Sequence, residues 1–173
     1  MIGTLILSHG RLADELLSAA RTITGGLEGF DSLSLEWSDG FDEAQTQIRA
    51  ALDRLDRGEG VLILTDMFGG TPCNVALTFL DPGRVEIVTG VNLPMVVRLA
   101  CLGRRELSVS EAARWLRDKG RRSICLASDI QAERCPPVGG PQSGAHSEEE
   151  MCDAAVADAR HPAAVGAGRE GGG

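Results

Sequence analysis

The chain has 173 residues, enough for one well-packed domain and too few for two ordinary ones. Its 25 acidic and 17 basic side chains give a net charge of −8, which argues against a nucleic-acid-binding surface, because phosphate contacts need clustered positive charge. The longest apolar runs are shorter than the roughly 20 residues of a membrane-spanning helix, and the N-terminus has no signal-peptide pattern, so we expect a cytoplasmic protein.

Strand and helix patterns alternate from the first residues of the chain. Residues 2–8 form a continuous apolar run, typical of a strand covered on both faces, and residues 12–23 place apolar side chains at helical spacing. Residues 30–37 alternate apolar and polar side chains, which indicates a strand nearer the edge of a sheet. A second helical pattern then runs over residues 41–58.

The alternation continues through the middle of the chain. A third strand is predicted at residues 60–65, followed by a helix over 71–80 in which Thr71 has the form of the N-cap. A fourth strand at residues 85–89 leads into a loop, and Pro94 stands at a plausible first turn of the next helix.

The last patterns complete the predicted fold. Ser108 and Glu111 predict the capping box of a helix that ends by Gly120, and the short apolar run at 123–127 indicates a fifth strand. Alternating strands and helices predict an α/β fold, a doubly wound and mostly parallel sheet flanked by helices. The first and third strands are the most uniformly apolar, so we expect them at the centre.

The composition changes at the end of this pattern. Residues 129–173 hold eight acidic residues against three arginines and eight of the 22 glycines. Such a segment cannot bury enough apolar area to offset its chain entropy. We therefore expect one domain over residues 1–128 and an acidic Gly/Pro/Ala-rich tail over residues 129–173 that is disordered.

His9 is the only histidine in the predicted domain, and it ends the first strand. Ligands of open α/β sheets bind beyond the carboxyl ends of the strands. A neutral imidazole offers an unprotonated nitrogen, so His9 is a candidate nucleophile. The simpler alternative is a polar residue that only ends a strand.

Asp66 follows the third strand in the same way. If the first and third strands are neighbours, Asp66 and His9 meet although 57 residues separate them. A carboxylate that accepts one imidazole N–H fixes the tautomer and stabilises the cation that forms when the other nitrogen attacks. We therefore predict catalytic roles for His9 and Asp66, the alternative for Asp66 being a turn aspartate.

A glycine-rich turn after Asp66 supplies the third part of the candidate site. Amides at the start of a helix bind anions well, and hydroxyl side chains add donors. We expect phosphate to be bound by Ser8, Gly69, Gly70 and Thr71. The alternative is a plain turn into a helix.

Three motifs together resemble a known family, the mannose-type IIA component (EIIA) of the bacterial phosphoenolpyruvate-dependent sugar phosphotransferase system. They are Ser8-His9-Gly10, Thr65-Asp66-Met67-Phe68-Gly69-Gly70-Thr71-Pro72-Cys73-Asn74 and Gly90-Val91-Asn92-Leu93-Pro94-Met95. The resemblance covers roughly residues 1–128.

The resemblance implies a phosphocarrier. His9 would accept a phosphoryl group from the phosphohistidine of the small protein HPr and pass it to a IIB component, which would be a separate chain or absent. Asp66 would hydrogen-bond the histidine ring, and Asn92 would border the site. The family also implies a homodimer whose last strand, about residues 121–128, pairs antiparallel in the partner's sheet.

Other functions are weighed against this one. The main alternative is a phosphorylation-dependent regulatory binding module with no role in sugar transport. A response-regulator receiver would need an acidic pair where Ser8-His9-Gly10 stands. We expect no cofactor, no metal, no nucleic-acid partner, and contact with the membrane only through transporter components.

Overall fold

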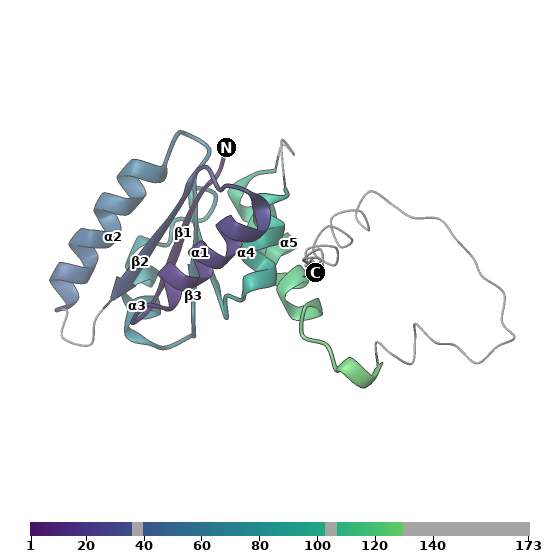
Figure 1. Ribbon diagram of the computed structural model, residues 1–173. Helices are drawn as coiled ribbons and strands as arrows, with labels where there is room; N and C mark the ends of the chain where they lie inside the picture. The colour runs from purple at the N-terminus through teal and green to yellow at the C-terminus, as the bar shows by residue number, and fades with distance from the viewer. Residues whose placement is uncertain (36–39, 103–106, 130–173) are drawn as a thin grey trace, which may run out of the picture. The chain divides into compact units, whose positions relative to one another are not determined.

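The computed structural model describes residues 1–35, 40–102 and 107–129, and strands and helices alternate along them (Figure 1). The elements are β1 (Gly3–His9), α1 (Leu12–Thr24), β2 (Phe30–Leu35), α2 (Phe41–Leu55), β3 (Val61–Thr65), α3 (Thr71–Ala76), the 3₁₀ turn η1 (Leu77–Phe79), β4 (Val85–Thr89), α4 (Leu93–Ala100) and α5 (Val109–Arg122).

The four strands form one parallel sheet in the order β2-β1-β3-β4. Leu7 of β1 lies opposite Thr65 of β3, and His9 lies opposite Leu35 of β2. Nearly every side chain of β1 and β3 is buried, which is why these strands read as unbroken apolar runs. The predicted α/β fold with the first and third strands at the centre is confirmed.

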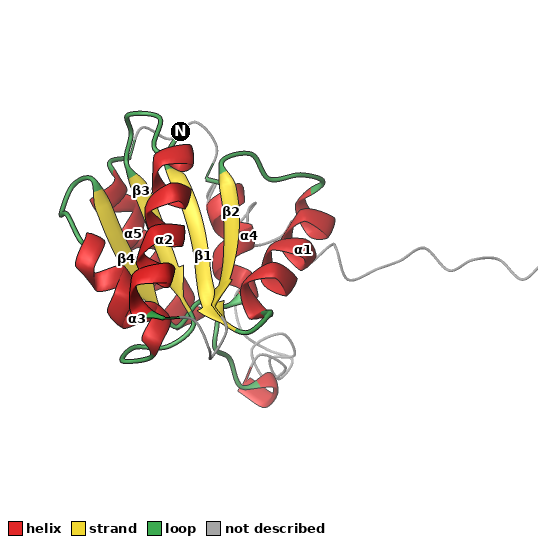
Figure 2. Cartoon of the chain, turned by 90° about the vertical axis from the view of Figure 1, so that its left-hand side faces the viewer, coloured by secondary structure: helices red, strands yellow, loops and turns green. Residues whose placement is uncertain are grey.

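Helices cover both faces of the sheet (Figure 2). Helices α2 and α3 pack on one face through a core that includes Leu5, Ile48 and Ile63, each fully buried. Helices α1, α4 and α5 cover the other face. The carboxyl ends of β1 and β3 therefore emerge side by side from a rigid support.

The starts of the helices follow local signals, and one of them is shifted. Ser108 and Glu111 form the predicted capping box at the start of α5. Helix α3 begins one residue earlier than expected, with Gly70 as the N-cap and Thr71 as the first helical residue. The reason is that the carbonyl of Gly70 accepts the first intrahelical bond, from Asn74 N–H at 2.9 Å.

The predicted fifth strand at residues 123–127 is wrong for this chain taken alone. Helix α5 continues through Arg122, and the chain then turns at Ser123, whose N–H donates to the carbonyl of Gly120 at 3.1 Å. A strand needs a neighbouring strand to supply hydrogen bonds, and none pairs with this segment among the described residues. Ile124 and Leu126 are left 82% and 65% exposed.

Two predictions lie outside the described residues. They are the end of the second strand, at residues 36–37, and the disordered tail, which falls outside from residue 130 onward. In the part of the chain that the structure does describe, no helix combines the length and the apolar character needed to cross a membrane.

Candidate functional site

The site is built where β1 and β3 end. Because Leu7 and Thr65 are paired across the two strands, the next residues along each strand bring His9 and Asp66 into contact. Their side chains are 20% and 13% exposed, so the pair is shielded from solvent and yet open on one side. The predicted contact between His9 and Asp66, which are 57 positions apart in the chain, is observed.

One carboxylate oxygen of Asp66 makes two hydrogen-bond contacts with His9. Its Oδ2 accepts the backbone N–H of His9 at 2.9 Å and lies 2.7 Å from the ring Nδ1. Its Oδ1 accepts the backbone N–H of Met67 at 2.8 Å. The carboxylate thereby locks both the main chain and the ring of His9, whereas the sequence predicted only the bond to the ring.

The charge on Asp66 fixes the tautomer of the ring. Burial disfavours the charged carboxylate, but the hydrogen bonds from the His9 backbone, the His9 ring and Met67 outweigh it and hold the pKa of Asp66 below its ordinary value. An ionised carboxylate only accepts hydrogen bonds, so Nδ1 carries the ring proton. In the neutral ring, the lone pair is then on Nε2.

The lowered pKa of Asp66 predicts a loss of stability in acid. A carboxyl group whose pKa is lower in the folded than in the unfolded state stabilises the fold above the unfolded value, about 3.9, and this contribution is lost as the pH falls through the folded pKa. Urea unfolding from pH 7 to pH 3 should therefore show a steeper loss in the wild type than in Asp66→Asn. Equal slopes for the two proteins would contradict the argument.

Ser8 precedes His9 on β1, and its hydroxyl already makes two hydrogen bonds within the chain. Its side chain is fully buried, and its hydroxyl accepts the backbone N–H of Ala13 at 2.7 Å while donating to the carbonyl of His9 at 3.3 Å. The hydroxyl therefore fastens the start of α1 to the end of β1. The predicted role of Ser8 in binding phosphate requires it to leave these bonds.

The glycine-rich turn runs along the other side of His9. Gly69 has φ +83°, a conformation that favours glycine, and its carbonyl accepts the side-chain amide of Asn74 at 3.1 Å. Gly70 lies against the His9 ring, and Thr71 is exposed at the start of α3. The sequence predicted backbone amide donors in this turn and a hydroxyl donor at Thr71. It missed the contact between Gly70 and the His9 ring, because nothing in the local pattern encodes that contact.

Asn92 belongs to the loop between β4 and α4. The N–H of Val91 donates to the carbonyl of Thr65 at 3.0 Å, which ties this loop to the end of β3 beside Asp66. The Asn92 side chain caps α4 by accepting the N–H of Met95 at 3.1 Å. The loop that holds Asn92 is therefore tied to the end of β3, and the place of Asn92 at the border of the site stays a prediction.

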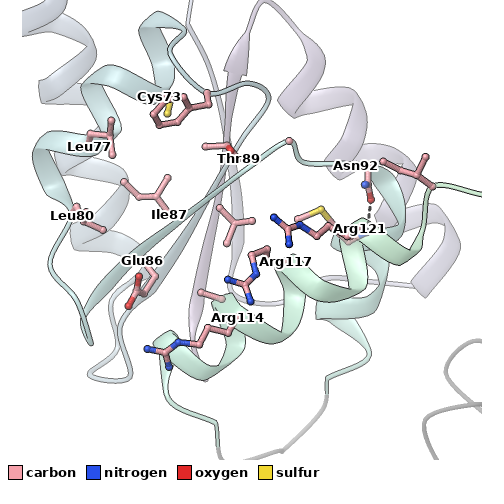
Figure 3. Close-up of a pocket in the computed structure, with 17 residues that line it drawn as sticks. Cys73, Leu77, Leu80, Glu86, Ile87, Thr89, Asn92, Arg114, Arg117 and Arg121 are labelled. Atoms are coloured by element: carbon pink, nitrogen blue, oxygen red, sulfur yellow. Dashed lines mark hydrogen bonds between the residues drawn. The ribbon is translucent and has the colours of Figure 1, made fainter.

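A groove of about 530 Å³ follows the outer edge of β4 (Figure 3). Leu77 and Leu80 line one side, and three arginines of α5 point into it from the other. These arginines are Arg114, Arg117 and Arg121. The sequence alone does not reveal this groove, because only the strand order shows that β4 is an edge strand.

The described residues contain no cluster of three or more metal-ligating side chains.

Comparisons with known proteins identify relatives of this chain. A family model described as "PTS system fructose IIA component" matches residues 3–114. The mannose-specific EIIAB component of Escherichia coli is 28% identical over 138 residues, which cover 79% of this chain and 43% of the relative. The chain thus spans less than half the length of that relative.

Two further relatives match over most of their own length. The fructose-specific EIIA component of Bacillus subtilis is 28% identical over 130 residues, 75% of this chain and 88% of the relative. A solved structure of a mannose/sorbose-specific IIA subunit from Enterococcus faecalis superposes with a TM-score of 0.65 at 31% identity, covering 72% of this chain and 93% of the other.

Proposed function

The chain belongs to the mannose-type EIIA family of the sugar phosphotransferase system, and on that basis we propose that it is a phosphocarrier that works through phosphohistidine at His9. It accepts a phosphoryl group from phospho-HPr and passes it to a IIB component. The observation that carries the proposal is the bond between Asp66 Oδ2 and His9 Nδ1 at 2.7 Å, because it leaves Nε2 as the nucleophile.

The reaction follows from this geometry. The lone pair of Nε2 attacks the phosphorus of phospho-HPr, a new N–P bond forms, and the old bond breaks with its electron pair leaving on the HPr imidazole. The His9 ring gains positive charge while Nδ1 keeps its proton. The negative charge of Asp66 stabilises that ring, as the orienting carboxylate does in other histidine-dependent sites. Transfer to IIB reverses the roles of donor and acceptor.

Two exposed apolar side chains support a protein as the donor. Met67 and Phe68 follow Asp66 directly and are 55% and 74% exposed. Large apolar side chains beside a reactive group are typical of a surface that a partner protein covers.

Phosphate labelling tests the proposal. Incubation with phosphoenolpyruvate, enzyme I and HPr should place on the chain a phosphate that is labile in acid and stable in base, as phosphohistidine is. Subsequent addition of a IIB component should remove it. A chain that takes up label but never passes it on would favour the regulatory binding module without transport, and a chain without label would contradict both functions.

We also propose a homodimer in the cytoplasm that meets the membrane only through transporter components. Strand β4 lies at the edge of the sheet with the groove beside it, and Ile124 both lines the groove and is exposed. The segment after α5 would add to β4 of a second copy as an antiparallel strand. Because Arg121 and Arg122 belong to α5, this strand would begin at Ser123 rather than at residue 121.

The dimer gives a prediction about mass in solution. Ile124→Asp should convert the dimer to a monomer, because a buried unpaired carboxylate at the new strand costs several kcal/mol. Analytical ultracentrifugation measures this, with Ile23→Asp as the control, since Ile23 is also an exposed isoleucine but lies on α1. A wild type that sediments as a monomer, or an Ile124→Asp variant that remains dimeric, would refute the proposed interface.

A further inference from the structure

Gly70 is a glycine that its own backbone does not require. It has φ −73° and ψ 163°, an extended conformation that any residue adopts, whereas its neighbour Gly69 has φ +83°. Gly70 is also the N-cap of α3, a position where serine, threonine, aspartate or asparagine serve at least as well as glycine. Neither the turn nor the cap explains the absence of a side chain.

The position of the His9 ring explains why residue 70 has no side chain. A Cβ built on Gly70 would lie 2.5 Å from Cε1 and 3.1 Å from Nε2 of His9, and 3.2 Å from Cγ of Met67. The first distance, 2.5 Å, is shorter than a Cβ atom approaches any nonbonded atom in folded proteins. The ring cannot move aside freely, because Asp66 holds both its Nδ1 and the backbone N–H of His9.

We propose that Gly70 is a positioning residue for His9: its missing side chain lets the Cε1–Nε2 edge of the ring lie against the turn while Asp66 holds Nδ1. The ring is thus set between a hydrogen bond on one side and a close backbone contact on the other. Its consequence for phosphoryl transfer rests on the proposed function, but the position of the ring does not.

The chain contains a matched control for this proposal. Gly40 is also a helix N-cap, with φ −69° and ψ 153°, and a Cβ added there meets nothing within 4 Å. Gly40→Ala and Gly70→Ala therefore make the same chemical change in the same backbone conformation. They differ in whether the new methyl group meets the His9 ring.

The first measurement is the imidazole of His9 in the unphosphorylated protein. Its ¹⁵N and ¹H signals are identified by their loss in His9→Ala, and in the wild type they should report a protonated Nδ1. Gly70→Ala should shift them away from that tautomer, while Gly40→Ala should leave them unchanged. Unchanged His9 signals in Gly70→Ala would overturn the proposal, even if labelling failed for the wild type.

The second measurement is the rate of phosphate uptake from phospho-HPr. A displacement of a reacting group by about 1 Å costs on the order of 100-fold, so Gly70→Ala should slow uptake by about that factor and Gly40→Ala by less than about twofold. If the wild type takes up no phosphate, the proposed function fails, and the ring signals still decide the role of Gly70.

A double-mutant cycle covers the case in which Gly70→Ala folds poorly. The thermal midpoint should fall more for Gly70→Ala than for Gly40→Ala in the wild type. In a His9→Ala background, with the ring removed, most of the difference between the two glycine substitutions should disappear, leaving only the effect of the 3.2 Å contact with Cγ of Met67. A difference of undiminished size without the ring would show that the contact with His9 is not its cause.

Discussion

Replacement of His9 by alanine will abolish phosphate uptake from phospho-HPr. In the proposed reaction His9 supplies the attacking Nε2, and the methyl group of alanine would leave Asp66 and the glycine turn with no nucleophile between them. We expect the label to fall by at least about 10³-fold, to the background of the assay, because removal of a nucleophile typically costs this much or more. The measurement is the acid-labile, base-stable label after incubation with phosphoenolpyruvate, enzyme I and HPr.

The other two histidines provide the control for this prediction. His146 and His161 belong to the acidic segment after residue 129, so His146→Ala and His161→Ala remove an imidazole while His9, Asp66 and the glycine turn keep their own side chains. Both variants should take up label as the wild type does. Label that survives His9→Ala, or that disappears with either tail variant, would place the phosphate elsewhere.

Replacement of Asp66 by asparagine will slow transfer strongly and leave the fold intact. Asparagine has nearly the shape of aspartate, and its amide oxygen can still accept the backbone N–H of His9. It lacks the negative charge that stabilises the ring cation. In the flipped orientation, with the amide nitrogen in place of Oδ2, asparagine loses the bond to the backbone N–H but presents its own N–H to Nδ1 and so favours the wrong tautomer. Comparable substitutions behind a catalytic histidine cost about 10²- to 10⁴-fold. Single-turnover transfer from phospho-HPr measures the loss.

Asp56 offers a matched control for this charge removal. Hydrogen bonding by the N–H of Gly58 and by Arg84 holds the pKa of Asp56 below its ordinary value, as other bonds do for Asp66. Asp56 directly follows α2 and lies before the amino end of β3, whereas His9 lies at the carboxyl end of β1. Asp56→Asn should transfer phosphate at the wild-type rate. Wild-type rates in Asp66→Asn as well would reduce Asp66 to a residue that only shapes its turn.

The strength of a local signal decided how well each element was predicted. Strands β1 and β3 were found because both faces are buried, which leaves an unbroken apolar run. The start of α5 was found because Ser108 and Glu111 satisfy backbone donors within a few residues of each other. Each of these signals depends only on neighbours in the chain, so the sequence alone contains it.

The sequence says less about features whose partners the local pattern does not specify. Residues 123–127 are apolar as a strand would be, but no described strand of this chain pairs with them, so they remain outside the sheet. Ser8 resembles a phosphate ligand in sequence, whereas the nearby start of α1 engages its hydroxyl. In both cases a partner that the local pattern does not specify sets the outcome.

The sequence by itself determined the chemical inventory of the site: a histidine after one buried strand, an aspartate after another, and a glycine-rich turn that follows. It did not determine their distances, because the pairing of β1 with β3 is a property of the whole sheet. Only the tertiary structure decided that Asp66 contacts Nδ1 of the His9 ring, the observation on which the proposed role of Nε2 rests. Only there does Gly70 become more than a turn residue, because the space that its side chain would fill belongs to a ring 61 positions earlier in the chain.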